Sequence, residues 1–152
     1  MPFNRYELTA TKTTLENGVE LHRIRATESI RLADGSVVSQ GQEGGWIESM
    51  YNLDQTGNSW IFGNAKVFGR ARISGAAVIR DNARVFDQAL IYGYATIEND
   101  SLVFENARVL ERAVVRCQAQ VSGFARIYGE AIITGSARVM GYARIAGKSV
   151  IL

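Results

Sequence analysis

The sequence predicts an all-β fold in which one chain winds into a parallel β-helix of about six triangular coils. Two observations lead to this prediction. From Ser59 to Leu152 the chain repeats every six residues without an insertion, and one column of the repeat holds only β-branched aliphatic residues. Ala or Ser stands two residues before each aliphatic, and a residue suited to turns, most often Gly, stands two residues after it. The column is Ile61, Val67, Ile73, Ile79, Val85, Ile91, Ile97, Val103, Val109, Val115, Val121, Ile127, Ile133, Val139, Ile145 and Ile151.

A strict period of six residues indicates short strands, because about 3.6 residues per turn would spread such a column around a helix. Two positions apart on a strand, the Ala and the aliphatic point to the same side, and the following Gly allows the backbone to turn. Three units form a triangular coil of about 18 residues, in which each strand pairs with its copies about 4.8 Å away. The chain has no Pro after Pro2, as a continuous ladder of backbone hydrogen bonds requires.

The first coil precedes the regular array and is expected to be irregular. Ile47 and Leu53 are six residues apart, but Ile61 follows Leu53 by eight. These three aliphatics therefore predict a first coil with a two-residue bulge around residues 55–57.

The residues upstream are expected to form a cap. Asn17-Gly18 predicts a β-hairpin with a type I′ turn, and Asp34-Gly35 predicts a second turn. The end of a solenoid exposes unpaired strand edges and half of its core. We therefore expect residues 1–45 to form an N-terminal β cap with a hairpin, and residues 46–152 to form the β-helix.

Composition places the chain among globular proteins, with 47% hydrophobic and 21% charged residues in 152. No apolar run is long enough to cross a bilayer, and the N-terminus lacks the apolar core of a signal peptide, so we expect a cytoplasmic protein without a membrane partner. A single cysteine, Cys117, is typical of a reducing compartment. Residues 1–58 hold five Lys/Arg against eight Asp/Glu, and residues 59–152 hold twelve against seven. The modest excess of Lys/Arg in residues 59–152 allows contact with nucleic acid but does not require it.

Three stretches are similar to a known family: LHRIRA (21–26), GGWIES (44–49) and GNSWIFGNAKVFGRARISG (57–75). Through them the chain resembles the YdcK-like proteins of enterobacteria and their phages, within the superfamily of trimeric, acyltransferase-like hexapeptide-repeat β-helices. The resemblance spans nearly the whole chain. It implies a left-handed coil and no catalytic residue.

The residues used by hexapeptide-repeat enzymes are missing from the repeat. Acyltransferases of this architecture use a histidine as the base, and residues 46–152 contain none. A γ-type carbonic anhydrase holds zinc with three histidines, whereas this chain has only His22, which we expect on a strand of the cap. The glycines lack the spacing of a phosphate-binding loop. We therefore predict no enzymatic activity, no cofactor and no metal.

The residues directly before and after each aliphatic point outward, and one wall combines arginines with tyrosines. A binding surface there would use the guanidinium groups to hold phosphates or carboxylates while the tyrosines stack. The alternative is a solvated face whose arginines turn toward corner acids such as Glu111 and Glu130. The stripe consists of Arg72, Arg108, Arg126, Arg144, Tyr92 and Tyr128.

Two further stripes are apolar and form candidate interfaces. Monomers seldom expose an apolar strip of this length, so we expect a cover: a second copy in a dimer or trimer, residues 1–45 folded back, or another protein. The first stripe is Trp60, Val78, Thr96, Val114, Ile132 and Val150. The second is Phe68, Phe86, Phe104 and Met140.

These observations predict a non-catalytic β-helix scaffold that associates with itself and binds through its flat walls. The resemblance suggests a different function as an alternative: a phage or prophage inhibitor that blocks a bacterial defence protein or nuclease, with a host or phage protein as its partner. A hexapeptide-repeat acyltransferase is the third possibility, and it would need His22 of a neighbouring subunit beside a cleft.

Overall fold

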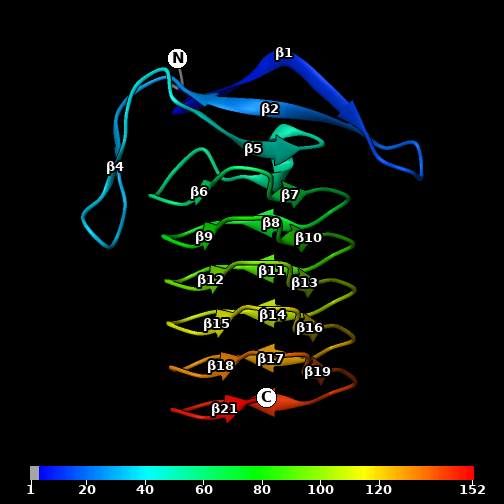
Figure 1. The fold of residues 1–152 in the computed structure, drawn as a ribbon. Coiled ribbons are helices and arrows are strands. Elements are labelled where there is room, and N and C mark those ends of the chain that lie inside the picture. Colours follow the sequence, from blue (N-terminus) through cyan, green and yellow to red (C-terminus); the bar gives the residue numbers. More distant parts are fainter. Residues whose placement is uncertain (1–3) are drawn as a thin grey trace.

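The computed structural model describes residues 4–152, and these form a parallel β-solenoid of six stacked coils with a cap at its N-terminal end (Figure 1). Besides its strands it has one short 3-10 helix, η1 (Met50–Asn52). The all-β fold class predicted from the hexad repeat is confirmed. The left-handed sense of the coil stays an expectation from the resemblance.

Each coil after the first contributes one strand to each of three walls. The first wall contains β1 (Tyr6–Thr14), β2 (Glu20–Ala26), β5 (Glu43–Ile47), β7 (Lys66–Val67), β10 (Arg84–Val85), β13 (Leu102–Val103), β16 (Gln120–Val121) and β19 (Arg138–Val139). The second contains β8 (Arg72–Ile73), β11 (Leu90–Ile91), β14 (Arg108–Val109), β17 (Arg126–Ile127) and β20 (Arg144–Ile145). The third contains β6 (Trp60–Ile61), β9 (Val78–Ile79), β12 (Thr96–Ile97), β15 (Val114–Val115), β18 (Ile132–Ile133) and β21 (Val150–Ile151).

The strands of each wall are parallel and pair residues that lie 18 positions apart. Val85 pairs with Val103 on the first wall, and Ile91 pairs with Val109 on the second. The aliphatic column and the alanines point inward and are fully buried through most of the stack. In the last coil Ile145 and Ile151 are only partly buried, because no coil lies beneath them.

The predicted first coil is confirmed. Ile47 pairs with Val67, Leu53 with Ile73 through an isolated bridge, and Ile61 with Ile79. The helix η1 takes the place of a strand on the second wall. Its buried Asn52 accepts hydrogen bonds from the backbone N–H groups of Glu48 and Ser49, and donates from Nδ2 to the carbonyl oxygens of Gly69 and Ala71. This side chain therefore replaces ladder hydrogen bonds that the helix cannot make.

The cap extends the first wall. Strands β1 and β2 form an antiparallel hairpin, β2 pairs antiparallel with β5, and β5 pairs parallel with β7. The boundary expected between residues 45 and 46 thus falls within β5. The hairpin turn lies where Asn17-Gly18 predicts it, but its type differs. Only Gly18 has a positive φ, and its N–H donates to the carbonyl of Leu15, which is a type I turn followed by a bulge rather than a type I′ turn.

A second, smaller hairpin joins β3 (Ile30–Arg31) to β4 (Val37–Val38) and extends from the cap along the side of the first coils (Figure 1). Its turn lies at Asp34-Gly35, as predicted. Ile30, Leu32 and Val38 are buried and belong to the same apolar cluster as the coils. Part of the N-terminal region therefore folds back against the solenoid.

The corners between walls place a residue in the left-handed backbone region. Glycine adopts it most readily, yet six corners hold another residue. At several of them the side chain accepts a hydrogen bond from the backbone N–H of the residue 18 positions later. Asp87 accepts from Glu105, Glu105 from Gly123, and Glu111 from Gly129. The acids at these corners thus have a structural role that offsets the strained backbone.

Candidate functional site

The second wall brings most of the predicted arginine–tyrosine stripe together in one shallow groove. Its strands alternate inward aliphatics with outward polar and aromatic residues. The groove has a volume of about 180 Å³. Its lining is Tyr92, Arg108, Leu110, Arg126, Tyr128 and Arg144.

Three arginines stand on successive strands of this groove. Arg108 pairs in register with Arg126, and Arg126 with Arg144, so their Cα atoms follow the strand spacing of about 4.8 Å. All three are exposed, and none of them forms an ion pair within residues 4–152. The corner acids considered as their partners do not pair with them, and Glu111 instead accepts the N–H of Gly129 at 2.9 Å. The ladder arginines therefore have no direct acidic partner among the described residues.

Arg72 is the exception in the stripe. Its guanidinium lies 5.0 Å from the ring centroid of Tyr51, donates to the carbonyl of that residue at 3.0 Å, and lies 3.5 Å from the carboxylate of Asp54. These contacts attach Arg72 to the first coil. On the next strand the column holds Leu90, so the free part of the ladder begins at Arg108.

The net positive charge of the solenoid is concentrated in its last coils, because the acids are confined almost entirely to the earlier ones. Residues 59–111 contain six Lys/Arg and six Asp/Glu, whereas residues 112–152 contain six Lys/Arg and only one acid, Glu130. The left-handed corners differ in the same way. They hold acids such as Asp87 and Glu105 in the middle coils but Gly123 and Gly141 below them. Averaging charge over the whole repeat conceals this asymmetry.

Two exposed aromatic residues border the arginine ladder. Phe124 and Tyr142 are 51% and 79% exposed, and their rings stack with centroids 5.1 Å apart and an angle of 5° between planes. They stand two residues before Arg126 and Arg144. Sequence reasoning missed them because it considered only the residues next to each aliphatic. The signal available was a pair of aromatics 18 residues apart at a corner.

The apolar stripe on the third wall is covered at one end. Trp60 is fully buried and Val78 is 8% exposed. The Tyr6 ring meets Trp60 edge to face at 6.4 Å, and a side chain at Gly44 would collide with the indole. The N-terminal segment thus covers Trp60, and Val78 on the next strand is buried as well. The lower part is uncovered: Thr96, Val114 and Ile132 are half-buried, and Val150 is 57% exposed.

The phenylalanine stripe on the first wall packs largely on itself. Phe68 is buried, and the rings of Phe68, Phe86 and Phe104 stack in sequence with centroids 5.1 Å apart. Ser122 interrupts the column, and Met140 beyond it is exposed. The stack therefore presents mainly ring edges to solvent.

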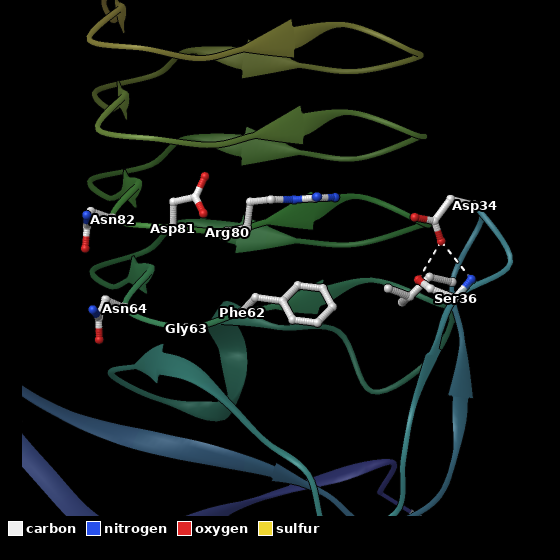
Figure 2. Close-up of a pocket in the computed structure, with 9 residues that line it drawn as sticks. Asp34, Ser36, Phe62, Gly63, Asn64, Arg80, Asp81 and Asn82 are labelled. Atoms are coloured by element: carbon white, nitrogen blue, oxygen red, sulfur yellow. Dashed lines mark hydrogen bonds between the residues drawn. The ribbon is translucent and has the colours of Figure 1, made fainter.

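A second hollow of about 530 Å³ lies between hairpin β3–β4 and the third wall (Figure 2). Arg80 extends toward Asp34 at the hairpin tip, and the Phe62 ring lies on the neighbouring coil. The Asp34 carboxylate accepts hydrogen bonds from the hydroxyl and N–H of Ser36, which lower the pKa of Asp34. Arg80 lies 3.9 Å from Glu98. The third charged residue of the lining, Asp81, accepts hydrogen bonds from the backbone and side-chain nitrogens of Asn99. All three charged groups of this hollow thus have local contacts.

The remaining chemically active side chains are dispersed. His22 lies on β2, as expected, with Nε2 3.7 Å from the Glu20 carboxylate. Cys117 is an exposed corner residue whose sulfur accepts a hydrogen bond from Thr134, and this bond lowers the pKa of the thiol. Within residues 4–152 no group of three or more His, Cys, Asp or Glu side chains is placed to hold a metal. Nor does that part of the chain contain a helix of the length and apolarity that a membrane span needs.

Comparison of the chain with protein-family models and with curated proteins finds no match to either. The fold and the geometry of the walls therefore carry the functional argument, and the resemblance to YdcK-like proteins stays an expectation.

Proposed function

We propose that the protein is a non-catalytic binding scaffold that holds an anionic partner on its second wall. The observation that carries this proposal is the ladder of Arg108, Arg126 and Arg144, which stand on successive strands without an acidic partner among residues 4–152. Stacked guanidinium groups repel one another. A bound polyanion relieves this repulsion and accepts bidentate hydrogen bonds from each arginine.

The solenoid suits this function because it fixes the spacing of the ladder. Arg108 and Arg126 are flanked on their strands by fully buried inward residues, such as Ala125 and Ile127, and the inward neighbours of Arg144 are partly buried. The Cα positions are thus set by a continuous hydrogen-bonded wall, and binding needs to order only the side chains. Such preorganisation reduces the entropic cost of binding a repetitive partner.

The test is retention on a heparin column, which presents a dense polyanion. Replacing Arg108, Arg126 and Arg144 together with Gln should lower the salt concentration at which the protein elutes. The matched control replaces Arg70, Arg84 and Arg138 with Gln; these residues are also exposed, and the net charge changes equally. Equal shifts in the two triple variants would contradict the proposal, because retention would then follow net charge alone.

Self-association is a second proposed property, and the half-covered apolar stripe favours it. Thr96, Val114, Ile132 and Val150 continue the column of Trp60 and Val78 beyond the N-terminal segment. A dimer or trimer that buries these four residues would remove the remaining apolar strip from water.

We further propose kinship with the YdcK-like proteins. The two N-terminal stretches that carry the resemblance lie side by side, since His22 pairs with Ile47 and Arg23 with Trp46 across β2 and β5. The Arg23 guanidinium also lies 4.4 Å from the Trp46 ring centroid and donates to the carbonyl of Gly44. The shared residues thus form one contact within the cap.

A further inference from the structure

We infer that the anionic partner is a single-stranded nucleic acid, bound across β14, β17 and β20 with its phosphates on the arginine ladder and its bases against Phe124 and Tyr142. This inference rests on the proposed function of the second wall. It adds the chemical class of the ligand, and the exposed aromatic pair beside the ladder is the observation that adds it.

The two columns lie side by side on the surface. Phe124 and Tyr142 lie in the turns that lead into β17 and β20, and each precedes the ladder arginine of its own coil by two residues. Two residues of chain span at most about 7 Å, so the aromatic column and the arginine column are neighbours on the surface. A nucleotide carries its anionic phosphate and its flat base on opposite sides of the sugar. One strand running along the stack can thus place phosphates on one column and bases on the other.

The aromatic pair favours bases over acidic side chains. Phe124 and Tyr142 are the residues at this corner that expose large apolar area, and a carboxylate-rich peptide would leave them in water. Tyr142 stacks on Phe124 with one ring face, and no aromatic ring of residues 4–152 stacks on its other face. An unpaired base can occupy that face, as in other single-strand binding surfaces that combine cationic grooves with aromatic platforms.

The local charge also suits a phosphate chain. In the last coils the corners that flank the ladder hold Gly123, Gly129, Gly141 and Gly147, and Glu130 is the single acid from residue 112 onward. The carboxylates of Glu105 and Glu111 accept the N–H groups of Gly123 and Gly129, so they lie at the upper end of the ladder. The last coil has glycine at both corners that flank Arg144, and a strand laid along the ladder therefore meets carboxylates only at its upper end. A duplex fits less well, because its base faces are already stacked and cannot reach the tyrosine.

The experiment measures fluorescence anisotropy of a labelled oligothymidylate of about 15 nucleotides titrated with the full chain. We expect saturable binding. The logarithm of the observed association constant should fall with the logarithm of salt concentration at a slope of about −2, as three phosphate contacts to a single strand predict. Arg126→Gln should weaken binding and flatten this slope. Tyr142→Ala should weaken binding about fivefold or more, as the loss of one stacked base predicts.

Two control variants and two control ligands separate the possible results. Arg84→Gln and Met140→Ala remove an exposed cation and an exposed apolar side chain from the first wall, and should leave binding unchanged. An abasic strand of equal length should bind more weakly than oligothymidylate, and a duplex of equal length should also bind more weakly. If the abasic strand binds equally and Tyr142→Ala has no effect while Arg126→Gln weakens binding, the nucleic-acid inference is wrong and anion binding stands. Failure to bind both the oligonucleotide and heparin would overturn the inference and the proposed function together.

Discussion

The guanidinium of Arg5 fills the loop that interrupts the first coil, and it donates a 2.7 Å hydrogen bond to the carbonyl oxygen of Ser59. The same side chain donates to the hydroxyl of Ser59 and, through Nε, to the carbonyl of Asp54. The two-residue insertion between Leu53 and Ile61 therefore wraps around a buried cation that comes from the cap. Burial lowers the pKa of Arg5, and the surrounding carbonyl oxygens compensate for part of its desolvation.

Replacing Arg5 with Met should lower the free energy of unfolding by about 3 kcal/mol, because the carbonyls of Asp54 and Ser59 lose their donor while remaining buried. Lys should not restore stability, since it lacks the forked geometry that reaches both carbonyls. Urea denaturation measures the change. The control is Arg25→Met, which removes an exposed ion pair with Glu7 and should cost less than about 1 kcal/mol. Similar losses in the two Met variants would show that Arg5 is not a structural element of the first coil.

Tyr6 should make the fold sensitive to alkali. Its hydroxyl donates to the carbonyl oxygens of Leu53 and Met50, and burial raises the pKa of Tyr6 to about 12. The folded state therefore holds this proton more tightly than the unfolded state, whose tyrosine has a pKa of about 10. The resulting contribution to stability, about 2–3 kcal/mol, is fully present below pH 10 and is lost as the pH rises through about 12.

The Tyr6→Phe variant tests this linkage. It should cost about 1 kcal/mol at pH 7, where the hydrogen bonds are lost, and its stability should fall less steeply than that of the wild type between pH 10 and pH 12. Urea denaturation across this range compares the two slopes. Parallel slopes would show that Tyr6 is not the titrating group.

The register of the coils can be tested by placing a charge on either side of the wall. Val109 is fully buried and Arg108 is exposed on the same strand. Val109→Asp buries a carboxylate without a partner and should cost several kcal/mol, enough to unfold the chain. Arg108→Asp should cost little. Circular dichroism during thermal unfolding distinguishes them, and equal destabilisation would refute the assigned register.

Because the corners stack closely, replacing glycine with alanine should destabilise the fold by different amounts at two corners whose backbone conformations are nearly equal. Gly93 and Gly141 have φ values of 66° and 65°, so alanine is strained at either position. A Cβ on Gly93 would lie 2.7 Å from the backbone nitrogen of Glu111, whereas one on Gly141 would meet no atom within 4 Å. We expect about 1 kcal/mol of destabilisation for Gly141→Ala and clearly more for Gly93→Ala, measured by urea denaturation. A larger effect at Gly141 would contradict the corner geometry.

The sequence predicts the parts of the fold that the repeat determines, but not the contacts made by residues that occur only once. Val109 and Arg108 occupy repeated positions, so the six-residue period alone predicts which of them is buried. Arg5 and Asn52 occur once each, and both bind backbone carbonyls, which have the same chemistry at every residue. Their roles arise from contacts between segments up to 54 positions apart, and no local pattern indicates them.

The candidate site was predictable to a similar extent. The period places Arg108, Arg126 and Arg144 in one column, but it does not give the direction in which each side chain extends. The acid expected to compensate the ladder, Glu111, instead accepts a backbone N–H from the coil below. Trp60 occupies an outward position of its column, yet the N-terminal segment folds over it. Cover by a distant segment depends on tertiary packing rather than on the repeat.

The uncovered part of the third wall gives the test of self-association. Val114 lies near its middle, half-buried on β15, with Thr96 and Ile132 as its neighbours in register. If two or three chains bury this strip against one another, Val114→Lys places a cation in the interface without a partner, and its desolvation opposes assembly. We expect the variant to be monomeric by light scattering at concentrations where the wild type is a dimer or trimer, with unchanged β-type circular dichroism.

Gln120→Lys is the matched control, because Gln120 is also half-buried and holds the same position on a strand of the first wall. It should leave the oligomer intact, since the first wall lies outside the proposed interface. If Gln120→Lys also dissociates the oligomer, the added charge rather than the third wall determines assembly. A wild type that is monomeric at tens of micromolar would refute self-association. The burial of Trp60 under the N-terminal segment, and of Val78 beside it, would then suffice to keep the chain monomeric, because only a short apolar strip is left exposed.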